Sequence, residues 1–454
     1  MAAKEKRVVI IGAGPCGLGA AYRLQELGYK NFAIYERNSY VGGISASFTD
    51  EKGFIWDQGG HVIFSHYPYF DKLMAKLLGK KYLEHLRECW IWMMDRFIPY
   101  PFQNNIRYLP KKELWECLYH LYLAQQNHED TEYSKNAKNF HDWIINSFGH
   151  GIAKYFMLPY NFKVWATPAK KMSANWIGER VSVINYEKIL TNIIAQKDEV
   201  SWGPNNKFKF PLYGGTGGLF TAFLPYLKNH LFLNKEIKYI NIKNKEIIFT
   251  DNLKEKYDIL ISTMPLNIFI NHSNAPQTIK NTGKKLKSNA VYVVGIGLEG
   301  KNKSKKCWVY FPEKKAPFYR VTYFSNYSPS NVPGKNYYSL MCEISESEYK
   351  KVNKKNIIAQ TIQGLINTKI ISATNRKKIV SKFLYKIPMA YPIPTLDRDK
   401  ILKNILPYLE KNNIYSRGRF GAWRYEIGNM DHSTMQGVEI IDRLLLREKE
   451  KTLA

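Results

Sequence analysis

The stretch that decides the fold is RVVIIGAGPCG, residues 7–17. It begins with a short run of apolar, β-branched residues over 8–11, which is typical of a buried parallel strand. A helical pattern follows over residues 18–27. Between them lie three glycines with the spacing G-x-G-x-x-G: Gly12, Gly14 and Gly17. The first allows a tight turn, the second lets the backbone approach a pyrophosphate, and the third packs the helix against the strand.

An acidic residue follows the second predicted strand, which covers residues 32–35. Glu36 comes nineteen residues after Gly17. A carboxylate at this distance can accept hydrogen bonds from a ribose. The strand, the glycine turn, the helix and the acid together predict a dinucleotide site.

Two further glycine-rich turns bear on which dinucleotide is bound. The segment VGGISAS, with Gly43, occupies residues 41–47, where nicotinamide enzymes usually begin an ordinary helix. In two-domain flavoproteins, which this pattern resembles, such a pair lies against FAD. A plain turn between two elements is the alternative. The segment GGTGG over 214–218, with Gly215, is consistent with a third approach of backbone to a flavin.

Size and cysteine content limit the class of protein. A chain of 454 residues with 45% hydrophobic residues predicts two or three packed domains. The uninterrupted apolar stretches are far shorter than a membrane span, so we expect no membrane partner. The five cysteines are odd in number and form no C-x-x-C pair. This pattern indicates a cytoplasmic protein without a disulfide framework, and we expect no metal site.

The formal net charge of +28 needs an explanation. Lysine-rich segments such as 301–306 and 350–355 carry much of it, and they fall in predicted surface turns. Such a charge attracts anions and could support nucleic-acid binding. A compositional bias toward lysine, asparagine and isoleucine on solvated faces is the favoured interpretation, so no nucleic-acid partner is predicted.

Hydrophobic periodicity predicts the remaining organisation. Amphipathic helices are expected in one inserted segment, over 111–126, 140–148, 151–158 and 186–195. A buried strand is expected over 257–263, and a mostly antiparallel sheet is expected from strands over 290–298, 307–311, 319–324 and 338–344. A final helix, over 438–446 and preceded by Asn429, should return to the nucleotide-binding part.

The predicted fold class is α/β, with a Rossmann-like FAD-binding domain, an inserted helical domain and a mostly antiparallel β-sheet domain. The FAD-binding domain is assigned to residues 1–90, continued at about 206–287 and 400–454. The helical substrate or lid domain is assigned to 111–205, with a mobile lid over 196–206. The sheet domain for substrate is assigned to 91–110 and 288–399.

Several longer blocks are more specific than the fold class. They are GGHVIFSHY (59–67), PYPFQNNI (99–106), PYNFKVW (159–165), GER (178–180), PFYR (317–320), FSNYSP (324–329) and SRGRFGAWRYE (416–426). With these blocks, the chain closely resembles UDP-galactopyranose mutases of the eukaryotic, fungal or protozoan-like type from residue 7 to about residue 446. The resemblance leaves the oligomeric state open.

The resemblance implies an isomerase of galactofuranose biosynthesis that interconverts UDP-galactopyranose and UDP-galactofuranose. In this family, N5 of reduced FAD attacks the anomeric carbon, and the reaction has no net redox change. NADPH or NADH is the implied external reductant.

The resemblance also implies roles for individual residues. The diphosphate would be held by Arg180 and Arg320, whose guanidinium groups suit bidentate bonds to phosphate. The hydroxyl donors implied at the same oxygens are those of Tyr310, Tyr391 and Tyr425. The uracil would be held by Tyr100, Phe102 and Gln103, and the site would also be lined by Asn161, Trp165 and Asn205.

The implied flavin contacts include Gly60, Arg419 and Asn429, and a turn at His61 that rearranges near flavin N5 on reduction. The residues expected to be catalytic are His61, Arg180 and Arg320. Without the resemblance, an arginine here would more often form a surface ion pair, and Trp165 would be an ordinary core residue.

Two alternatives stay open at this stage. The first is an FAD-dependent amine oxidase, desaturase or protoporphyrinogen oxidase on the same fold, which would act on apolar or amine substrates. The second is a basic binding module without enzymatic activity, supported only by the net charge.

Overall fold

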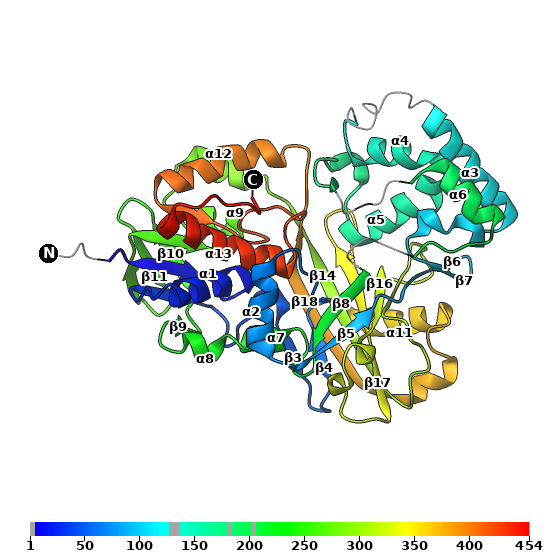
Figure 1. Ribbon diagram of the computed structural model, residues 1–454, viewed down its shortest axis with the longest axis horizontal. Coiled ribbons are helices and arrows are strands. Elements are labelled where there is room, and N and C mark those ends of the chain that lie inside the picture. The colour runs from blue at the N-terminus through cyan, green and yellow to red at the C-terminus, as the bar shows by residue number, and fades with distance from the viewer. Residues whose placement is uncertain (1–4, 127–136, 179–180, 182–183, 201–205, 454) are drawn as a thin grey trace.

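The computed structural model describes residues 5–126, 137–178, 181, 184–200 and 206–453. In Figure 1 a parallel sheet with its helices lies at the left, and a group of helices lies above a second, larger sheet at the right. The chain passes between these parts several times, so each is built from segments far apart in sequence.

The parallel sheet has five strands in the order β19-β13-β1-β2-β9. Their bounds are β19 Ile414–Ser416, β13 Ile259–Ser262, β1 Val8–Ile11, β2 Phe32–Tyr35 and β9 Leu231–Phe232. Every pairing in this sheet is parallel. β1 is buried along its whole length because both faces of the sheet are covered, which explains its unbroken apolar run. The predicted Rossmann-like sheet is thereby confirmed.

Helices cover one face of this sheet, and a mixed layer covers the other. Val8 and Ile10 pack toward a helical layer, whereas Val9 and Ile11 pack on the opposite side. The helical layer contains α1 Pro15–Glu26, α2 Pro68–Leu78, α7 Gly217–Thr221, α8 Leu224–Leu227 and α13 Met430–Leu446. The opposite layer contains the antiparallel strands β10 Ile237–Asn241, β11 Glu246–Phe249 and β12 Lys254–Lys256, with α9 Leu266–Asn271, α10 Gln277–Gly283 and α12 Arg398–Lys411.

The larger sheet has seven strands in the order β18-β14-β17-β16-β15-β6-β7. Their bounds are β18 Ile379–Pro392, β14 Ser288–Glu299, β17 Tyr337–Glu346, β16 Arg320–Tyr323, β15 Trp308–Tyr310, β6 Cys89–Met93 and β7 Arg96–Pro99. The pair β15–β6 is parallel and the other five pairs are antiparallel. This confirms the predicted mostly antiparallel sheet. Two small antiparallel ribbons join the sheets: β3 Ser47–Thr49 with β4 Ile55–Asp57, and β5 Tyr82–Leu86 with β8 Lys207–Pro211.

The inserted helices pack on one face of the larger sheet. They are α3 Lys111–Gln126, α4 Phe140–Ile152, a π-helical turn Ala153–Met157, α5 Leu158–Trp165 and α6 Tyr186–Ile194. They share one hydrophobic core with the inner strands, and α11 Ile357–Asn367 packs on the other face. The helices expected over 111–126 and 186–195 are present, and those expected over 140–148 and 151–158 form a nearly continuous run.

Sequence periodicity did not predict β18, α2, α11 or α12. β18 is an edge strand with many partly exposed positions, so its hydrophobic pattern is weak. No described helix is both long and apolar enough to cross a lipid bilayer. All five cysteines are buried and free. The division into domains by residue number stays a prediction.

Candidate active site

A cavity of about 720 Å³ is lined by loops of the parallel sheet and by strands of the larger sheet. Gly12, Gly14 and Glu36 line it from the part around the parallel sheet, and Arg87, Trp308 and Tyr310 line it from the part around the larger sheet. The predicted dinucleotide motif and several predicted substrate residues therefore share one cavity. The predicted site residues among its lining are Gly12, Gly14, Glu36, Gly43, Gly60, His61, Tyr310, Arg320, Tyr391, Arg419, Tyr425 and Asn429.

The glycine turn leaves room for a pyrophosphate. Gly12 has φ +95°, and a Cβ there would lie 2.3 Å from Thr263 Oγ1. A Cβ at Gly17 would lie 1.8 Å from the carbonyl oxygen of Gly12, which fits its predicted packing role. A Cβ at Gly14 would instead meet only the α-carbon of Gly43, at 3.9 Å. The backbones of Gly14 and Gly43 therefore lie close to each other, and both glycines border the cavity.

The carboxylate of Glu36 is held in place by nearby amides. Glu36 Oε2 accepts a hydrogen bond from the backbone N–H of Ala13 at 2.8 Å. Its Oε1 accepts bonds from the backbone N–H of Asn38 at 2.9 Å and from the side chain of Asn38 at 2.7 Å. The side chain is buried but borders the cavity, where it can accept hydrogen bonds from ribose hydroxyls.

Two helix N-termini border the same cavity. α1 begins at Pro15 and α13 begins at Met430, with Asn429 as its N-cap residue. Unpaired N–H groups and the helix dipole make such termini favourable to phosphates and to carbonyl oxygens. The site therefore has the parts that an FAD molecule needs: a glycine cradle, a ribose acceptor and two positive helix ends.

The turn Gly59-Gly60-His61 lies between this region and the larger sheet. Burial lowers the pKa of His61 to about 4, and the charge of Arg419 acts in the same direction. His61 is therefore neutral at physiological pH. Its Nδ1 is buried and has no hydrogen-bond partner among the described residues. A polar atom left in this way, next to a cavity, is available to a ligand.

The partly buried Arg320 and the buried Glu343 form an ion pair at the cavity wall. Glu343 accepts a 2.8 Å hydrogen bond from Nη2 of Arg320 and a second bond from its Nε. Burial opposes both charges, but each partner stabilises the other. As a result, the pKa of Arg320 lies well above its ordinary value and that of Glu343 lies below it.

Aromatic residues predicted for substrate binding cluster beside this pair. Trp165 contacts the rings of Tyr425 and Tyr391, with centroids 4.7 and 5.8 Å away. The guanidinium of Arg419 lies 5.0 Å from the ring of Tyr391 and 5.5 Å from that of Tyr425. The hydroxyl of Tyr391 lies 3.4 Å from that of Tyr319. This geometry can present hydroxyl and guanidinium donors to one anion.

A second aromatic group lies where the larger sheet borders the cavity. Tyr310 packs against Tyr100 and Tyr160, with ring centroids 5.3 and 5.1 Å apart. Arg87 lies 5.0 Å from the ring of Tyr100 and 5.3 Å from that of Trp308. Burial raises the pKa of Tyr310 to about 12, so its hydroxyl remains a donor at neutral pH. Of these residues, Tyr310, Trp308 and Arg87 border the cavity, and two aromatic rings beside a cation suit a flat base.

Other predicted residues lie behind the walls or outside the described chain. Phe102 is fully buried and stacks on Phe156, and Asn161 donates to the carbonyl of Met157 at 2.8 Å. Tyr100, Phe102, Gln103, Asn161 and Trp165 do not border the cavity, nor do Gly17 and Gly215. Arg180 and Asn205 lie outside the described residues, as does part of the predicted lid. The roles predicted for all these residues stay predictions.

Sequence reasoning missed Arg87, Trp308, Tyr319 and Glu343. Arg87 and Trp308 meet only because β6 and β15 pair in parallel, although the two strands are far apart in the chain. Glu343 lies directly opposite Arg320 in the register of β16 and β17. Tyr319 had a local signal, since it precedes Arg320 in the block PFYR.

One group of potential metal ligands lies at the start of α13. Nδ1 of His66 and Nδ1 of His432 lie 2.7 and 3.0 Å from the two carboxylate oxygens of Asp431. Hydrogen bonds from the two histidines outweigh burial and lower the pKa of Asp431. The carboxylate is therefore satisfied by the two imidazoles. The expectation of no metal stays a prediction.

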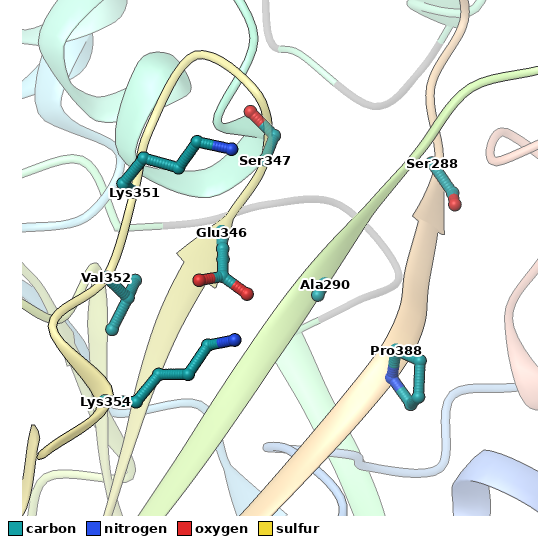
Figure 2. Close-up of a pocket in the computed structure, with 8 residues that line it drawn as sticks. All are labelled: Ser288, Ala290, Glu346, Ser347, Lys351, Val352, Lys354 and Pro388. Carbon is teal, nitrogen blue, oxygen red and sulfur yellow. The ribbon is translucent and has the colours of Figure 1, made fainter.

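A second pocket, of about 460 Å³, is shown in Figure 2. It lies at the ends of β14, β17 and β18 and includes Lys351, Lys354 and Glu346. Glu346 accepts hydrogen bonds from Lys386 at 3.0 Å and from the hydroxyl of Tyr292 at 3.1 Å. The lining contains no glycine turn, so this pocket lacks the features of the dinucleotide site.

Comparison with known proteins agrees with this geometry. A model of the family described as flavin containing amine oxidoreductase matches residues 15–384. A crystal structure of reduced UDP-galactopyranose mutase is 44% identical, covers 99% of this chain and 96% of its own, and superposes with a TM-score of 0.95. The chain belongs to the UDP-galactopyranose mutase family. It shares with that structure both the parallel sheet and the larger sheet, because the match covers nearly all of each chain.

More distant relatives share only parts of the chain or only the fold. Zeta-carotene desaturase of Capsicum annuum is 38% identical over 77 residues, which are 17% of this chain and 13% of that protein. Protoporphyrinogen oxidase 2 of Arabidopsis thaliana is 37% identical over 76 residues, which are 17% of this chain and 15% of that protein. The chain thus matches less than a sixth of these curated relatives' length. A putrescine oxidase structure, 16% identical over 97% of this chain and 99% of its own, has a TM-score of 0.69 and shows the shared fold.

Proposed function

We propose that this chain is a flavin-dependent isomerase that interconverts UDP-galactopyranose and UDP-galactofuranose. The observation that carries this proposal is the 44% identity to a UDP-galactopyranose mutase along nearly the whole of both chains. The cavity supports it, because the predicted dinucleotide motif and the cationic, tyrosine-rich wall line one continuous space. An oxidase of apolar substrates would not need a partly buried arginine with hydroxyl donors around it.

Bound, reduced FAD supplies flavin N5 as a nucleophile for the anomeric carbon, so the reaction requires reduction but consumes no reductant. The residues of this chain would keep the leaving diphosphate in place until the bond to the sugar forms again. Arg320 offers a charged donor for the phosphate oxygens, and the hydroxyls of Tyr310, Tyr391 and Tyr425 offer neutral ones. Arg180 would add a second arginine.

Two features of the wall would serve the reaction: one excludes water, and the other avoids extra positive charge. Tyr310, Tyr391 and Trp308 present aromatic surface along the substrate end, which disfavours bulk water. His61 lies between that end and the glycine turns, and its low pKa keeps it neutral. A neutral imidazole can hydrogen-bond to the cofactor or the sugar without adding positive charge beside Arg320 and Arg419.

The finer assignments are also proposals. The motif blocks support the eukaryotic type, and the cysteine pattern supports a cytoplasmic location. NADPH or NADH is proposed as the external reductant because the activity requires reduced FAD. The division into an FAD-binding domain, a helical substrate or lid domain and a sheet domain rests on the sequence pattern and the element order.

Product chromatography tests the proposed function. Dithionite-reduced protein incubated with UDP-galactofuranose under nitrogen should form UDP-galactopyranose over many turnovers for each FAD. Air-oxidised protein should form none. Oxygen uptake with an amine or an apolar substrate, in the absence of UDP-sugar turnover, would instead place the chain among the oxidases of the same fold.

A further inference from the structure

Glu343 is a buried carboxylate in the middle of the larger sheet, outside every group of residues assigned to the site from sequence. It belongs to β17 and faces Arg320 across the antiparallel pair β16–β17. Only 2% of its surface is exposed. A charge in such a place is costly unless its oxygens are hydrogen-bonded, so its partners indicate what it does.

Both oxygens of Glu343 are engaged by residues of the cavity wall. Oε1 accepts bonds from Nη2 of Arg320 at 2.8 Å and from the hydroxyl of Tyr319 at 3.0 Å. Oε2 accepts from Nε of Arg320. The backbone adds to this arrangement, because the N–H of Tyr319 donates to the carbonyl of Glu343 at 2.9 Å. The carboxylate is therefore fixed in orientation.

This arrangement orients Arg320 before any ligand binds. The carboxylate engages the Nε–Nη2 edge of the planar guanidinium, and no bond to Nη1 is found within the described residues. An arginine that is already fixed in one plane loses less conformational entropy when it binds a phosphate. The same carboxylate reaches Tyr391 indirectly, since the hydroxyl of Tyr319 lies 3.4 Å from that of Tyr391.

The glycine turn before His61 packs on the ion pair. A Cβ at Gly59, where φ is +123°, would lie 3.2 Å from Oε1 of Glu343. A Cβ at Gly60 would lie 3.0 Å from Cζ of Arg320. Glu343 thus contacts both the side of the cavity that would hold the diphosphate and the turn that would face the flavin.

We propose that Glu343 is a positioning residue for the UDP diphosphate, acting through Arg320 and, by way of Tyr319, through Tyr391. The proposal rests on the proposed function, because it assumes that a UDP-sugar occupies this end of the cavity. The carboxylate itself would not touch the substrate. Its effect on binding should therefore disappear when Arg320 is removed.

A double-mutant cycle on UDP affinity tests this dependence. The variants are Arg320→Ala, Glu343→Gln and the two combined, each first shown to carry one FAD per chain by absorbance. Glu346→Gln is the matched control: Glu346 lies on the same strand and bonds to a lysine and a tyrosine, but it borders the second pocket (Figure 2). The dissociation constant of UDP is measured by calorimetry with the oxidised holoenzyme.

We expect Glu343→Gln to weaken UDP binding about tenfold, the scale for losing one hydrogen bond to a charged group. Arg320→Ala should weaken it further, and the combined variant should differ from Arg320→Ala by no more than about twofold. Glu346→Gln should bind UDP as the wild type does. Normal UDP affinity in Glu343→Gln, or factors that simply multiply in the combined variant, would overturn the positioning role.

If Glu343→Gln fails to retain FAD, Tyr319→Phe decides the question, because it keeps the ion pair and removes the hydroxyl that links Glu343 to Tyr391. It should weaken UDP binding about threefold, and this effect should be lost in a Tyr391→Phe background. Unchanged affinity in Tyr319→Phe would then overturn the proposal. If the wild-type holoenzyme neither binds UDP nor isomerises UDP-galactofuranose, the proposed function is also wrong. If the wild type does both but the effects of the two substitutions are additive, only the role of Glu343 is wrong.

Discussion

Adding one methyl group at Gly60 should disturb the substrate site through its contacts with Thr322 and Arg320. A Cβ at Gly60 would lie 2.7 Å from Oγ1 of Thr322 and 3.0 Å from Cζ of Arg320. Ordinary contacts begin at 3.4 Å, so the shifts needed are 3.4 minus 2.7, or 0.7 Å, and 3.4 minus 3.0, or 0.4 Å. The backbone of Gly60 is not in the left-handed region, so the strain comes from these contacts alone.

The neighbours of Gly60 have little freedom to move away. Thr322 is fully buried in β16, and Arg320 is held by Glu343. Overpacking of this kind typically costs about 1–3 kcal/mol. If the shifted guanidinium must return to its original position to bind the diphosphate, this cost is subtracted from the binding free energy. UDP affinity should then fall about 5- to 150-fold in Gly60→Ala. Because Gly60 is also an implied flavin contact, UDP affinity is compared only in protein shown by absorbance to carry one FAD per chain.

Calorimetric titration of the oxidised holoenzyme with UDP measures this effect, and kcat/KM for UDP-galactofuranose should fall in parallel. Gly334→Ala is the matched control, since a Cβ there would meet only Cδ2 of Tyr337, at 3.9 Å, and its φ is not positive. Gly334→Ala should behave as the wild type does. Gly60→Ala with wild-type UDP affinity and kcat/KM would refute the reasoning that this turn packs against the diphosphate-binding arginine.

Four further results are expected. Arg320→Lys should lower kcat/KM at least about 30-fold, because an ammonium cannot bond to Glu343 and a phosphate in one plane. Arg376→Lys on the surface should leave kcat/KM unchanged, and equal kcat/KM values for the two variants would contradict the role of Arg320. Glu36→Gln should weaken FAD binding about tenfold in a fluorescence titration, since a charged ribose acceptor is lost, while the exposed Glu51→Gln should bind FAD normally. Burial raises the pKa of Asp57 from 3.8 to about 7, so the stability that its proton contributes is present below about pH 4 and lost as the pH rises through 7. The melting temperature should therefore fall more between pH 5 and pH 8 in the wild type than in Asp57→Asn, and equal falls would count against this shift. Burial raises the pKa of the cavity-lining Cys16 to about 12, so the thiol stays protonated, and acid precipitation should release all the flavin; yellow colour left on the precipitated chain would show a covalent link.

Much of the nucleotide-binding part could be predicted from sequence because its signals are local. The run over 8–11 is buried on both faces, and the glycines that follow meet steric limits set by residues of the same βαβ unit or by the adjacent strand. α3 begins and ends at the residues that the periodicity indicated. β18 was not predicted because an edge strand has no strict hydrophobic alternation, and its place depends on pairing with β14.

For the candidate site, the sequence predicted which types of side chain would be present. It did not predict which residues those side chains would contact. Guanidinium, hydroxyl and aromatic groups at Arg320, Tyr391 and Trp165 could be assigned from the blocks that contain them. Phe102 has the right chemistry to stack on a base, yet the fold buries it against Phe156. Whether a side chain borders a cavity depends on the direction in which its element is packed, and a single sequence does not contain that direction.

The sequence by itself determined the dinucleotide turn, the acid after the second strand and the helical insertion, because each depends on residues close together in the chain. Only the tertiary structure decided that Glu343 neutralises Arg320, that Arg87 meets Trp308, and that the turn at His61 packs on that ion pair. These contacts join strands that are distant in sequence, and they form where pairing register and burial bring charges together out of water. The charge on the substrate side of the cavity and the orientation of its arginine are therefore determined by the tertiary structure.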